Sequence, residues 1–438
     1  MLQLLDLRGQ NLTANLAERL PRASHDVADV LPAVTALINE VRTRGTTALR
    51  DHAERFDGVR PPHLRVPASA LPQAADQLDP VVRKALELAI DHAQRGHEAQ
   101  LPQEVTTHII PGGTIRQRWI PVDRVGLYAP GGLAAYPSSV VMNAVAAQVA
   151  GVQQIALASP PQRDHGGLPH PAVLAACYLL GIDEVYAVGG ADAIGMFAYG
   201  VADEDGAPMC PRVDVVTGPG NVYVAAAKRA VAGVCGIDAE AGTTEIAIIA
   251  DDTAEPAYVA ADLISQAEHD PAAASVLITA SEALVDAVVA QVEEQCMQAT
   301  HRERITQALS GPQSGIVLVD DAATAIDVAN AYAAEHLEIH TADAPAVAAR
   351  IRHAGAIFVG PYTPVPLGDY VAGSNHVLPT GGTARYRAGL SVMPYIRPVQ
   401  QVEYSREALA AVSEPLAALA LTEGLPAHAR AASIRSEH

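Results

Sequence analysis

Apolar side chains near the start of the chain recur with the period of a helix. They lie three to four residues apart, as on one buried helix face, at Val30, Leu31, Val34, Leu37, Ile38 and Val41. Gly45 follows this stripe, and glycine commonly ends helices. We therefore expect the chain to be helical up to about residue 105.

From Val122 onward the pattern changes to short, often β-branched apolar runs that alternate with alanine-rich helical segments. Such alternation, with strands that are apolar on both faces, is typical of parallel sheets covered by helices on both sides. The predicted strands form two series, at residues 154–158, 184–188 and 213–216, and then at 245–250, 275–279, 315–319, 337–340 and 356–359.

The predicted fold is accordingly α/β, with two doubly wound, incomplete Rossmann-like parallel-sheet lobes. We place a helical N-terminal arm at residues 1–22, a first lobe at 23–245, a second lobe at 246–386 and a helical C-terminal tail at 387–438.

The composition favours a globular protein of two or three domains. The chain has 438 residues, of which 49% are apolar and 18% charged. Its net charge of −20 argues against nucleic acid or an anionic membrane as the main partner. The four cysteines are scattered and form no C-x-x-C pair, which favours a reducing cytoplasm over a disulfide framework.

Residues 125–162 carry no charge, but prolines, glycines and glutamines interrupt them before a run of about 20 apolar residues accumulates. A membrane span is therefore not expected. Residues 1–6 lack the basic leader and long apolar core of a signal peptide, so we expect none.

A dinucleotide site is not evident from the glycine pattern alone. The G-x-G-x-x-G sequence that usually follows the first strand of a nicotinamide-binding lobe is missing. The nearest candidates, at residues 188–191 and 218–221, each lie between a predicted strand and a helix. They fit a phosphate turn, but any tight strand–helix connection has the same form.

Three polar residues share one face of the helix predicted to follow Asp251. Pro256 lies in its first turn, and Asp262, Gln266 and His269 fall on one stripe because positions three and four apart are neighbours. Gln266 and His269 could bind one metal ion. A polar helix end facing water has the same pattern, and glutamine is an uncommon zinc ligand.

Glu335 and His336 directly precede a predicted strand, and a carboxylate beside an imidazole supplies two proton acceptors of different pKa. An accidental surface pair is the alternative. The glycine-rich, polar segment 368–376 follows a buried strand through a long loop, which favours a functional segment. Glu423 and His428 flank a helix break in the tail and look ordinary on their own.

Taken together, these segments resemble the histidinol dehydrogenase family, over essentially the whole chain. Their order and spacing are more specific than any one motif. The matching stretches are Val125-Gly126-Leu127-Tyr128, Pro130-Gly131-Gly132, Gly218-Pro219-Gly220-Asn221, Ser265-Gln266-Ala267-Glu268-His269, Glu335-His336-Leu337, Gly368-Asp369-Tyr370 and Gly373 to Thr380, with Glu423 and His428 in the tail.

The resemblance implies a zinc site and a substrate site. Gln266, His269 and Asp369 are expected to bind one zinc ion per subunit, completed by His428 of the partner subunit. Nitrogen and oxygen ligands without thiolate suit a metal that positions a substrate. The expected contacts to L-histidinol are these four residues and His336, together with Ser138, Thr244, His376 and Glu423.

The resemblance also implies the chemistry. His336 is expected to take the alcohol proton in a first NAD-dependent oxidation, and Glu335 to activate water for a second, giving L-histidine through an enzyme-held L-histidinal. Tyr128, Asp192 and Asn221 match cofactor contacts, which places NAD on the first lobe. A tail that reaches the partner subunit implies a homodimer with a shared active site.

Three residues depart from the family pattern. Asp192 stands where glutamine is usual, and its carboxylate would repel a nearby pyrophosphate or accept bonds from ribose hydroxyls. We predict weaker NAD affinity than in an Asp192→Gln variant. Thr243 replaces a common proline, and Leu133 replaces a small or polar residue; neither belongs to the implied metal or proton-transfer set.

Three other functions compete with this hypothesis. The same scaffold could oxidise another small alcohol, since fold does not fix substrate. A two-lobed, non-catalytic binding protein would use a similar cleft, but the Glu335-His336 pair argues against it. A zinc hydrolase is disfavoured because no H-E-x-x-H helix is present.

Overall fold

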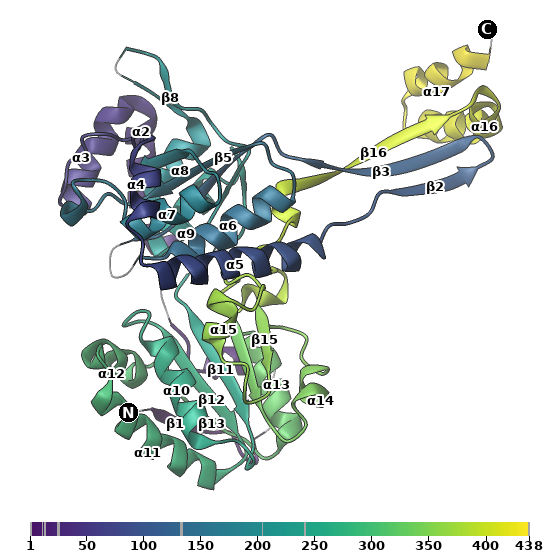
Figure 1. The fold of residues 1–438 in the computed structure, drawn as a ribbon. Coiled ribbons are helices and arrows are strands. Elements are labelled where there is room, and N and C mark those ends of the chain that lie inside the picture. The colour runs from purple at the N-terminus through teal and green to yellow at the C-terminus, as the bar shows by residue number, and fades with distance from the viewer. Residues whose placement is uncertain are drawn as a thin grey trace.

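The computed structural model describes residues 2–10, 12, 15–23, 27–131, 135–203, 205–240 and 242–436. In Figure 1 the chain forms an upper lobe, a lower lobe and a long arm that projects from the upper lobe. The two lobes each contain a parallel sheet covered by helices on both faces, which confirms the predicted α/β class.

The first lobe is built on a five-stranded parallel sheet in the order β10-β9-β4-β5-β6. Two buried clusters lie on its faces, one under α4 to α7 and the other under α2, α8 and α9. The strands are β4 (Arg124–Tyr128), β5 (Gln154–Ser159), β6 (Glu184–Ala187), β9 (Val215–Thr217) and β10 (Gly236–Ile237). The helices are α2 (Val27–Arg44), α3 (Thr46–Phe56), α4 (Ala70–Asp76), α5 (Pro80–Glu98), α6 (Pro137–Val149), α7 (Pro171–Leu179), α8 (Gly190–Tyr199) and α9 (Val222–Val231), with a small hairpin of β7 (Val201–Ala202) and β8 (Pro208–Cys210).

The second lobe is built on a six-stranded parallel sheet in the order β1-β13-β12-β11-β14-β15. Helices α10, α11 and α12 cover one face, and α1 and α13 cover the other. The strands are β1 (Gln3–Asp6), β11 (Glu245–Ala250), β12 (Ala274–Thr279), β13 (Gly315–Leu318), β14 (His336–His340) and β15 (Ala356–Val359). The helices are α1 (Leu16–Arg19), α10 (Pro256–Ala267), α11 (Glu282–Gln298), α12 (Arg302–Ser310), α13 (Ala322–Tyr332), α14 (Ala344–Ala348) and α15 (Val365–Tyr370).

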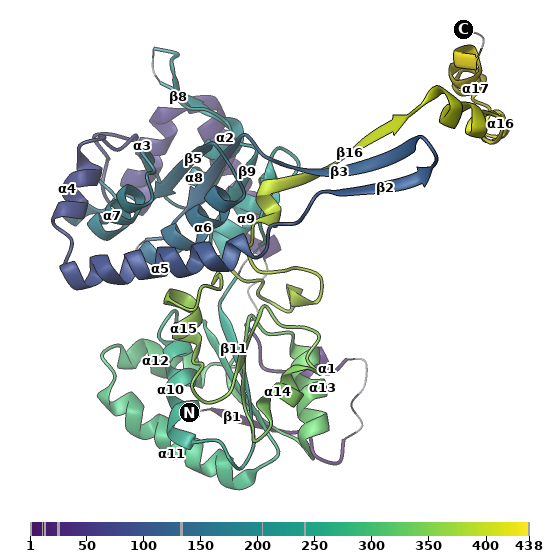
Figure 2. The ribbon, with the colours of Figure 1, turned by 45° about the vertical axis from the view of Figure 1, so that its right-hand side comes forward.

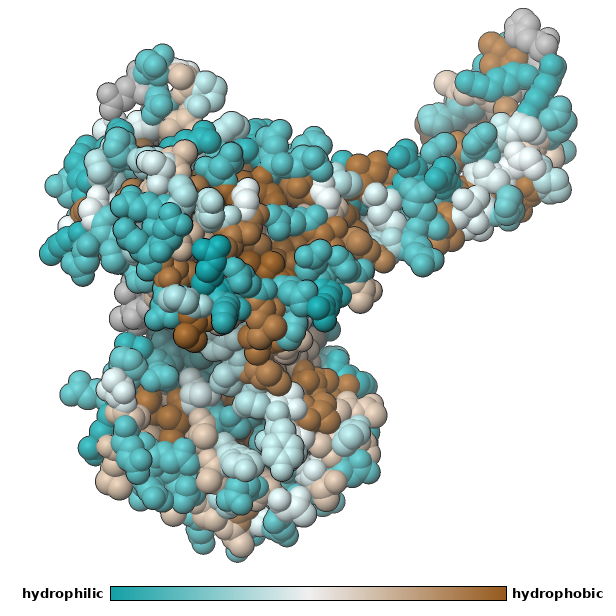
Figure 3. Space-filling model, in the orientation of Figure 1, coloured by the Kyte–Doolittle hydropathy of each residue, from teal (hydrophilic) through white to brown (hydrophobic). Residues whose placement is uncertain are grey.

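The arm is an antiparallel sheet in the order β16-β3-β2 that carries two helices at its far end (Figure 2). Its strands are β2 (Val105–Ile110), β3 (Gly113–Pro121) and β16 (Ile396–Tyr404), followed by α16 (Arg406–Thr422) and α17 (Pro426–Ser433). Figure 3 shows apolar residues among polar ones along this arm, and several are exposed, including Val402, Leu419 and Leu421.

The predicted strands of both series are present within about two residues of their expected bounds, and Gly45 does follow the end of α2. The strands that were not predicted include β4 and β10 of the first sheet, β2 and β3 of the arm, and two strands at the ends of the chain. The segment 1–22 contributes β1 to the second sheet, and the tail 387–438 contributes β16 to the arm, so neither is wholly helical. Within the described ranges, no helix combines the length and apolar character needed to cross a membrane.

Candidate active site

Glu335 and His336 lie at the amino end of β14, beside the amino end of β11. The preceding helix, α13, ends at Ala333, whose φ of +53° turns the chain sharply into the strand. Both side chains are buried, and His336 Nδ1 lies 3.6 Å from Glu335 Oε2. The structure therefore joins the two residues of the predicted acid–base pair inside the protein.

A chain of hydrogen bonds connects Glu335 to the end of α10. Thr244 Oγ1 donates to Glu335 Oε2 at 2.6 Å, and Gln266 Nε2 donates to Thr244 Oγ1 at 2.7 Å. The backbone N–H of Glu245 donates to the same Glu335 oxygen at 2.9 Å. Burial raises the pKa of Glu335 well above its usual range, so this carboxyl group holds a proton more strongly than one in water.

His336 is held as a neutral imidazole with one open nitrogen. Its Nδ1–H donates to the backbone carbonyl of Glu245 at 3.3 Å, which fixes the tautomer, and its Nε2 is buried without a hydrogen-bond partner. Burial lowers the pKa of His336 to about 4. Near neutral pH, Nε2 is therefore a free proton acceptor.

The residues predicted to bind zinc leave donor atoms open for a cation. Gln266 Oε1 is buried without a partner, and His269 Nδ1 donates to the carbonyl of Ser265 at 3.1 Å, which leaves Nε2 free. Both residues lie at the C-terminal end of α10, where the helix dipole favours positive charge. Asp369 lies one residue before the end of α15, and its charge and that of His269 both act on the pKa of His336. The donor set thus fits a divalent ion.

His376 joins this group to the first lobe. Its Nδ1–H donates to the carbonyl of Asp369 at 3.1 Å, and Ser139 Oγ lies 3.2 Å from its Nε2. Because burial lowers the pKa of His376, its neutral Nε2 accepts this bond from the serine hydroxyl. Sequence reasoning named Ser138 and missed Ser139; Pro137 begins α6 and places both serines in its first turn, and that proline was the available clue.

The three predicted cofactor residues lie at the carboxyl ends of the first sheet. Tyr128 ends β4, Asp192 lies in the first turn of α8 after β6, and Asn221 caps α9 after β9. The strand order reverses between β4 and β9, and ligands of doubly wound sheets bind at such a reversal. Tyr128 Oη accepts a hydrogen bond from the N–H of Gly190 at 3.0 Å.

Asp192 has an internal partner that the sequence did not reveal. His52 Nδ1 lies 2.9 Å from Asp192 Oδ1, and His52 Nε2 lies 3.3 Å from Glu40 Oε2. The hydrogen bond to Asp192 raises the pKa of His52, and burial raises the pKa of Asp192. Burial and the nearby charge of Asp192 raise the pKa of Asp57 to about 6. The carboxylate of Asp192 is thus partly compensated by an imidazole from α3.

Comparison with known proteins identifies the family. A family model described as histidinol dehydrogenase matches residues 20–436. The chain belongs to the histidinol dehydrogenase family. It is 61% identical to the histidinol dehydrogenase of Thermobifida fusca over 98% of this chain and 97% of that protein, and 57% identical to that of Mycobacterium tuberculosis over 99% and 98%. A crystal structure of histidinol dehydrogenase from Elizabethkingia anophelis matches with a TM-score of 0.91 and 30% identity, covering 100% of this chain and 98% of that one.

Membership in the histidinol dehydrogenase family makes the chain an oxidoreductase of histidine biosynthesis. Two of the predicted site residues lie far from the others in the single chain. Glu423 directly follows α16 and His428 lies in α17, the two helices at the far end of the arm (Figure 1), and both residues are exposed. Within the described part of the chain, no hydrogen bond or ion pair joins them to the other predicted site residues.

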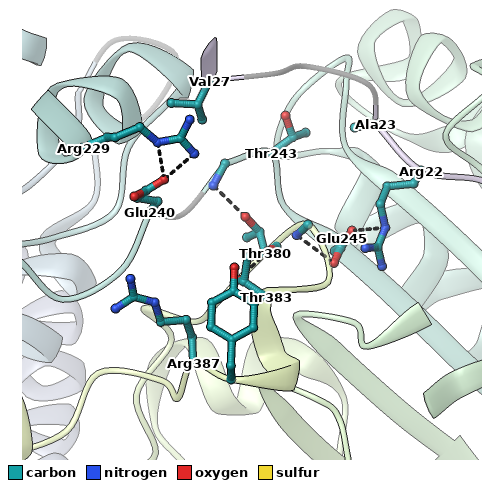
Figure 4. Close-up of a pocket in the computed structure, with 13 residues that line it drawn as sticks. Arg22, Ala23, Val27, Arg229, Glu240, Thr243, Glu245, Thr380, Thr383 and Arg387 are labelled. Atoms are coloured by element: carbon teal, nitrogen blue, oxygen red, sulfur yellow. Dashed lines mark hydrogen bonds and ion pairs between the residues drawn. The ribbon is translucent and has the colours of Figure 1, made fainter. Parts of the chain in front are cut away.

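Of the two other residues that depart from the family pattern, the structure describes Thr243 but not Leu133. Leu133 lies outside the described residues. Thr243 lines a cavity of about 480 Å³ between Arg229 and Arg387 (Figure 4). On the wall of this cavity, the side chain of Glu245 pairs with Arg22 at 3.4 Å, which anchors the residue whose backbone holds Glu335 and His336.

A second polar cluster lies deeper in the second lobe and was not predicted as a site. Asp262, Glu338 and His340 are buried, and their possible ligand atoms lie within 4.8 Å of one another; among the described residues, this is the one such group of three His, Cys, Asp or Glu side chains. Burial raises the pKa of Asp262 to about 8 and that of Glu338 to about 7. Two acids this close retain a proton between them, which offsets part of their repulsion.

Proposed function

We propose that this chain oxidises L-histidinol to L-histidine in two successive NAD-dependent steps, with one zinc ion per subunit positioning the substrate. The observation that carries the proposal is the buried chain of bonds from Gln266 through Thr244 to Glu335, next to the open Nε2 of His336. Family membership supplies the substrate name, and this geometry supplies groups suited to both oxidations.

In the first oxidation, His336 is the base. Its imidazole is neutral because burial lowers its pKa to about 4, and its Nδ1–H donates to Glu245 O, so the unpaired Nε2 is available to take the alcohol proton. NAD, when bound, would accept hydride from the same carbon, and the product would be an aldehyde retained on the enzyme. A base already oriented and desolvated lowers the barrier without reorganising.

In the second oxidation, Glu335 activates the water that adds to the aldehyde. One of its oxygens, Oε2, is occupied by Thr244 and the backbone of Glu245, which leaves the other oxygen for water. A carboxylate with a raised pKa is a stronger base than one in solution, so it removes a proton from water more readily. A second NAD, when bound, would accept the hydride of the hydrated aldehyde.

Gln266, His269 and Asp369 would hold the zinc ion, which when bound acts as a Lewis acid and orients the amino alcohol. The free Gln266 Oε1 and His269 Nε2 support this assignment. His376 bonds Ser139 across the two lobes, and Ser138 precedes that serine in the first turn of α6. Ser138 and His376 would contact the substrate, with Thr244 bound to Gln266.

NAD would bind across the carboxyl ends of the first sheet. Both α8 and α9 begin there, and helix N-termini stabilise the negative charge of a pyrophosphate. Tyr128 and Asn221 flank the reversal of strand order, and Asp192 lies in the first turn of α8.

The site would be completed by a second copy of the chain. His428 and Glu423 lie on an arm whose leucines Leu419 and Leu421 are 67% and 59% exposed, an unfavourable surface for an isolated subunit. We therefore propose a homodimer in which His428 of the partner subunit is the fourth zinc ligand and Glu423 of the partner subunit contacts the substrate.

One mixing experiment tests the base and the shared site together. His336→Asn and His428→Ala should each abolish NADH formation from histidinol. After the two inactive proteins are unfolded and refolded together in equal amounts, half of the dimers are hybrids with one intact site, so about a quarter of wild-type activity returns.

The controls separate the possible failures. Each variant refolded with itself should remain inactive. If His428 served its own chain, both sites of a hybrid would be damaged and no activity would return. Normal turnover by His336→Asn alone would instead refute the proposed base.

A further inference from the structure

Lys228 is buried beneath the glycine turn that follows β9. The chain has only two lysines, and only 1% of the Lys228 side chain is exposed. Its ammonium group contacts three oxygens: the carbonyl of Gly218, Oδ1 of Asp238 at 2.5 Å and the carbonyl of Ala239 at 3.2 Å. Three acceptors around one nitrogen suit the three donors of a lysine and not the flat fork of an arginine.

Asp238 completes the contact with Gly218 from the other side. Its Oδ2 accepts the N–H of Gly218 at 2.9 Å, while its Oδ1 binds Lys228. Both polar backbone atoms of Gly218 are therefore held by one buried ion pair. Asp238 is itself 3% exposed in its side chain and directly follows β10.

Gly218 is also pressed against the end of β4. Its φ is +128°, and a Cβ at this position would lie 2.1 Å from the carbonyl oxygen of Tyr128. No other residue fits such a contact without moving the backbone. The turn Gly218–Asn221 is thus fixed against Tyr128 by packing and against α9 and β10 by the ion pair.

This placement coincides with the reversal of strand order between β4 and β9, where the proposed cofactor residues Tyr128 and Asn221 lie. Asn221 accepts the N–H groups of Tyr223 and Val224 and so fixes the start of α9. A shift of Gly218 would move this helix start relative to Tyr128.

We propose that Lys228 and Asp238 are positioning residues for the dinucleotide. They hold the Gly218–Asn221 turn so that the N-terminus of α9 keeps a fixed position beside the end of β4 at Tyr128, where NAD is proposed to bind. The inference rests on the proposed function, because it assumes that NAD binds at this edge.

A second buried ion pair provides a matched control on the same sheet. Arg124 and Glu184 form two bonds, at 2.9 and 2.5 Å, and their side chains are 9% and 15% exposed. These residues begin β4 and β6, so the pair lies at the amino edge, opposite the turn. Removing it should weaken the lobe without moving the turn.

The test compares the double variants Lys228→Met/Asp238→Asn and Arg124→Met/Glu184→Gln, each of which removes both charges together. Calorimetry gives the NAD dissociation constant, steady-state kinetics give KM for NAD and for histidinol, and thermal melting gives Tm. We expect the first variant to raise the NAD dissociation constant by about tenfold or more, with KM for histidinol changed less than about twofold. The control should lower Tm with the NAD dissociation constant unchanged.

Each outcome decides between the proposals. A folded Lys228→Met/Asp238→Asn protein that binds NAD like the wild type overturns the positioning role. An equal loss of NAD affinity in both double variants also overturns it, since the effect would then be general destabilisation. Failure of the wild type to bind NAD would refute the proposed function instead. If the first double variant does not fold, the single variant Asp238→Asn is measured, because it weakens the bonds of Asp238 to Gly218 N and Lys228. It must then also raise the NAD dissociation constant.

Discussion

The two lobes present opposite edges of similar parallel sheets to the candidate site. In the first lobe, Tyr128 and Asn221 lie at the carboxyl ends of strands, as in most doubly wound sheets. In the second lobe, Glu335 and His336 lie at the amino end of β14, and Thr244 directly precedes β11. His376 and Ser139 connect these two edges across the lobes.

Because the two edges differ, the helices at each edge present opposite ends of their dipoles, and each lobe therefore stabilises a ligand of different charge. At a carboxyl edge helices begin, so α8 and α9 direct N–H groups and positive charge toward the proposed site of the anionic dinucleotide. At an amino edge helices end, so α10 directs its negative end toward the proposed cation site at Gln266 and His269. The cofactor and the metal are therefore each expected on the lobe whose helix ends have the opposite charge.

Replacing Glu335 should have the strongest effect, because it changes the chemistry at the edge of the second lobe without changing the edge of the first. Glu335→Gln removes the proposed water-activating base of the second lobe and leaves the first lobe intact. We expect oxidation of added histidinal to slow by about a hundred- to ten-thousandfold, the usual range for a lost general base, while NAD affinity is unchanged. Rapid-mixing measurement of NADH formed from histidinal, with NAD calorimetry on the same protein, checks this.

Glu268, an exposed residue next to the proposed zinc ligand His269, provides the control for that change. Glu268→Gln alters the same kind of group near His269 without touching the bonds of Thr244, and it should oxidise histidinal normally. A Glu335→Gln protein that converts histidinal at the wild-type rate would remove the proposed base from the second lobe.

The lobes also differ in how they bury acids, and this predicts a smaller effect, on stability. Asp238 and Glu184 of the first lobe are paired with a lysine and an arginine, whereas Asp262 faces Glu338 and His340. Burial raises the pKa of Asp262 from 3.8 to about 8, so the folded protein binds a proton that the unfolded chain releases. Stability should therefore fall as the pH rises from about 4 through about 8.

Asp262→Asn should flatten this dependence. We expect the loss of unfolding free energy between pH 6 and pH 8.5 to shrink by on the order of 3 kcal/mol, since each unit of pKa shift corresponds to about 1.4 kcal/mol and the two acids share one proton. Urea unfolding at both pH values measures it. Asp286→Asn, an exposed change on α11, should leave the slope unaltered; an unaltered slope in Asp262→Asn would show that the cluster carries no such proton.

The sequence predicted most strands of the two parallel sheets because their apolar runs are short and bounded by glycine or proline. The strands β4 and β10 of the first sheet were not among them. Residues 245–250 and 356–359 agree with β11 and β15 at every position. It missed β1 and β16 because these edge strands are largely exposed, so their side chains carry no buried pattern. Pairing partners decide them: β1 adds to β13 across more than three hundred residues of chain, and β16 runs beside β3.

The site residues that belong to family motifs were predicted from the sequence, whereas the contacts that depend on packing between distant segments were not. Gln266 and Glu335 were named from such motifs, but the threonine bridge between them depends on how β11 and α10 pack. His52 was missed because it lies 140 positions from Asp192, in a helix with no motif of its own. The shared proton of Asp262 and Glu338 likewise depends on contacts that only the fold creates.

The smallest expected effect concerns Asp192, where the first lobe places a carboxylate beside its positive helix ends. The hydrogen bond from His52 offsets part of its charge, so the repulsion of a pyrophosphate is reduced and not removed. Asp192→Gln should therefore lower KM for NAD by only about two- to fivefold, below the roughly 1.4 kcal/mol of a tenfold change. His52→Gln, which keeps the carboxylate and removes its compensating imidazole, should raise KM for NAD instead. Steady-state kinetics with saturating histidinol measure both variants, and a higher KM in Asp192→Gln would mean that the carboxylate binds ribose hydroxyls and contributes to affinity.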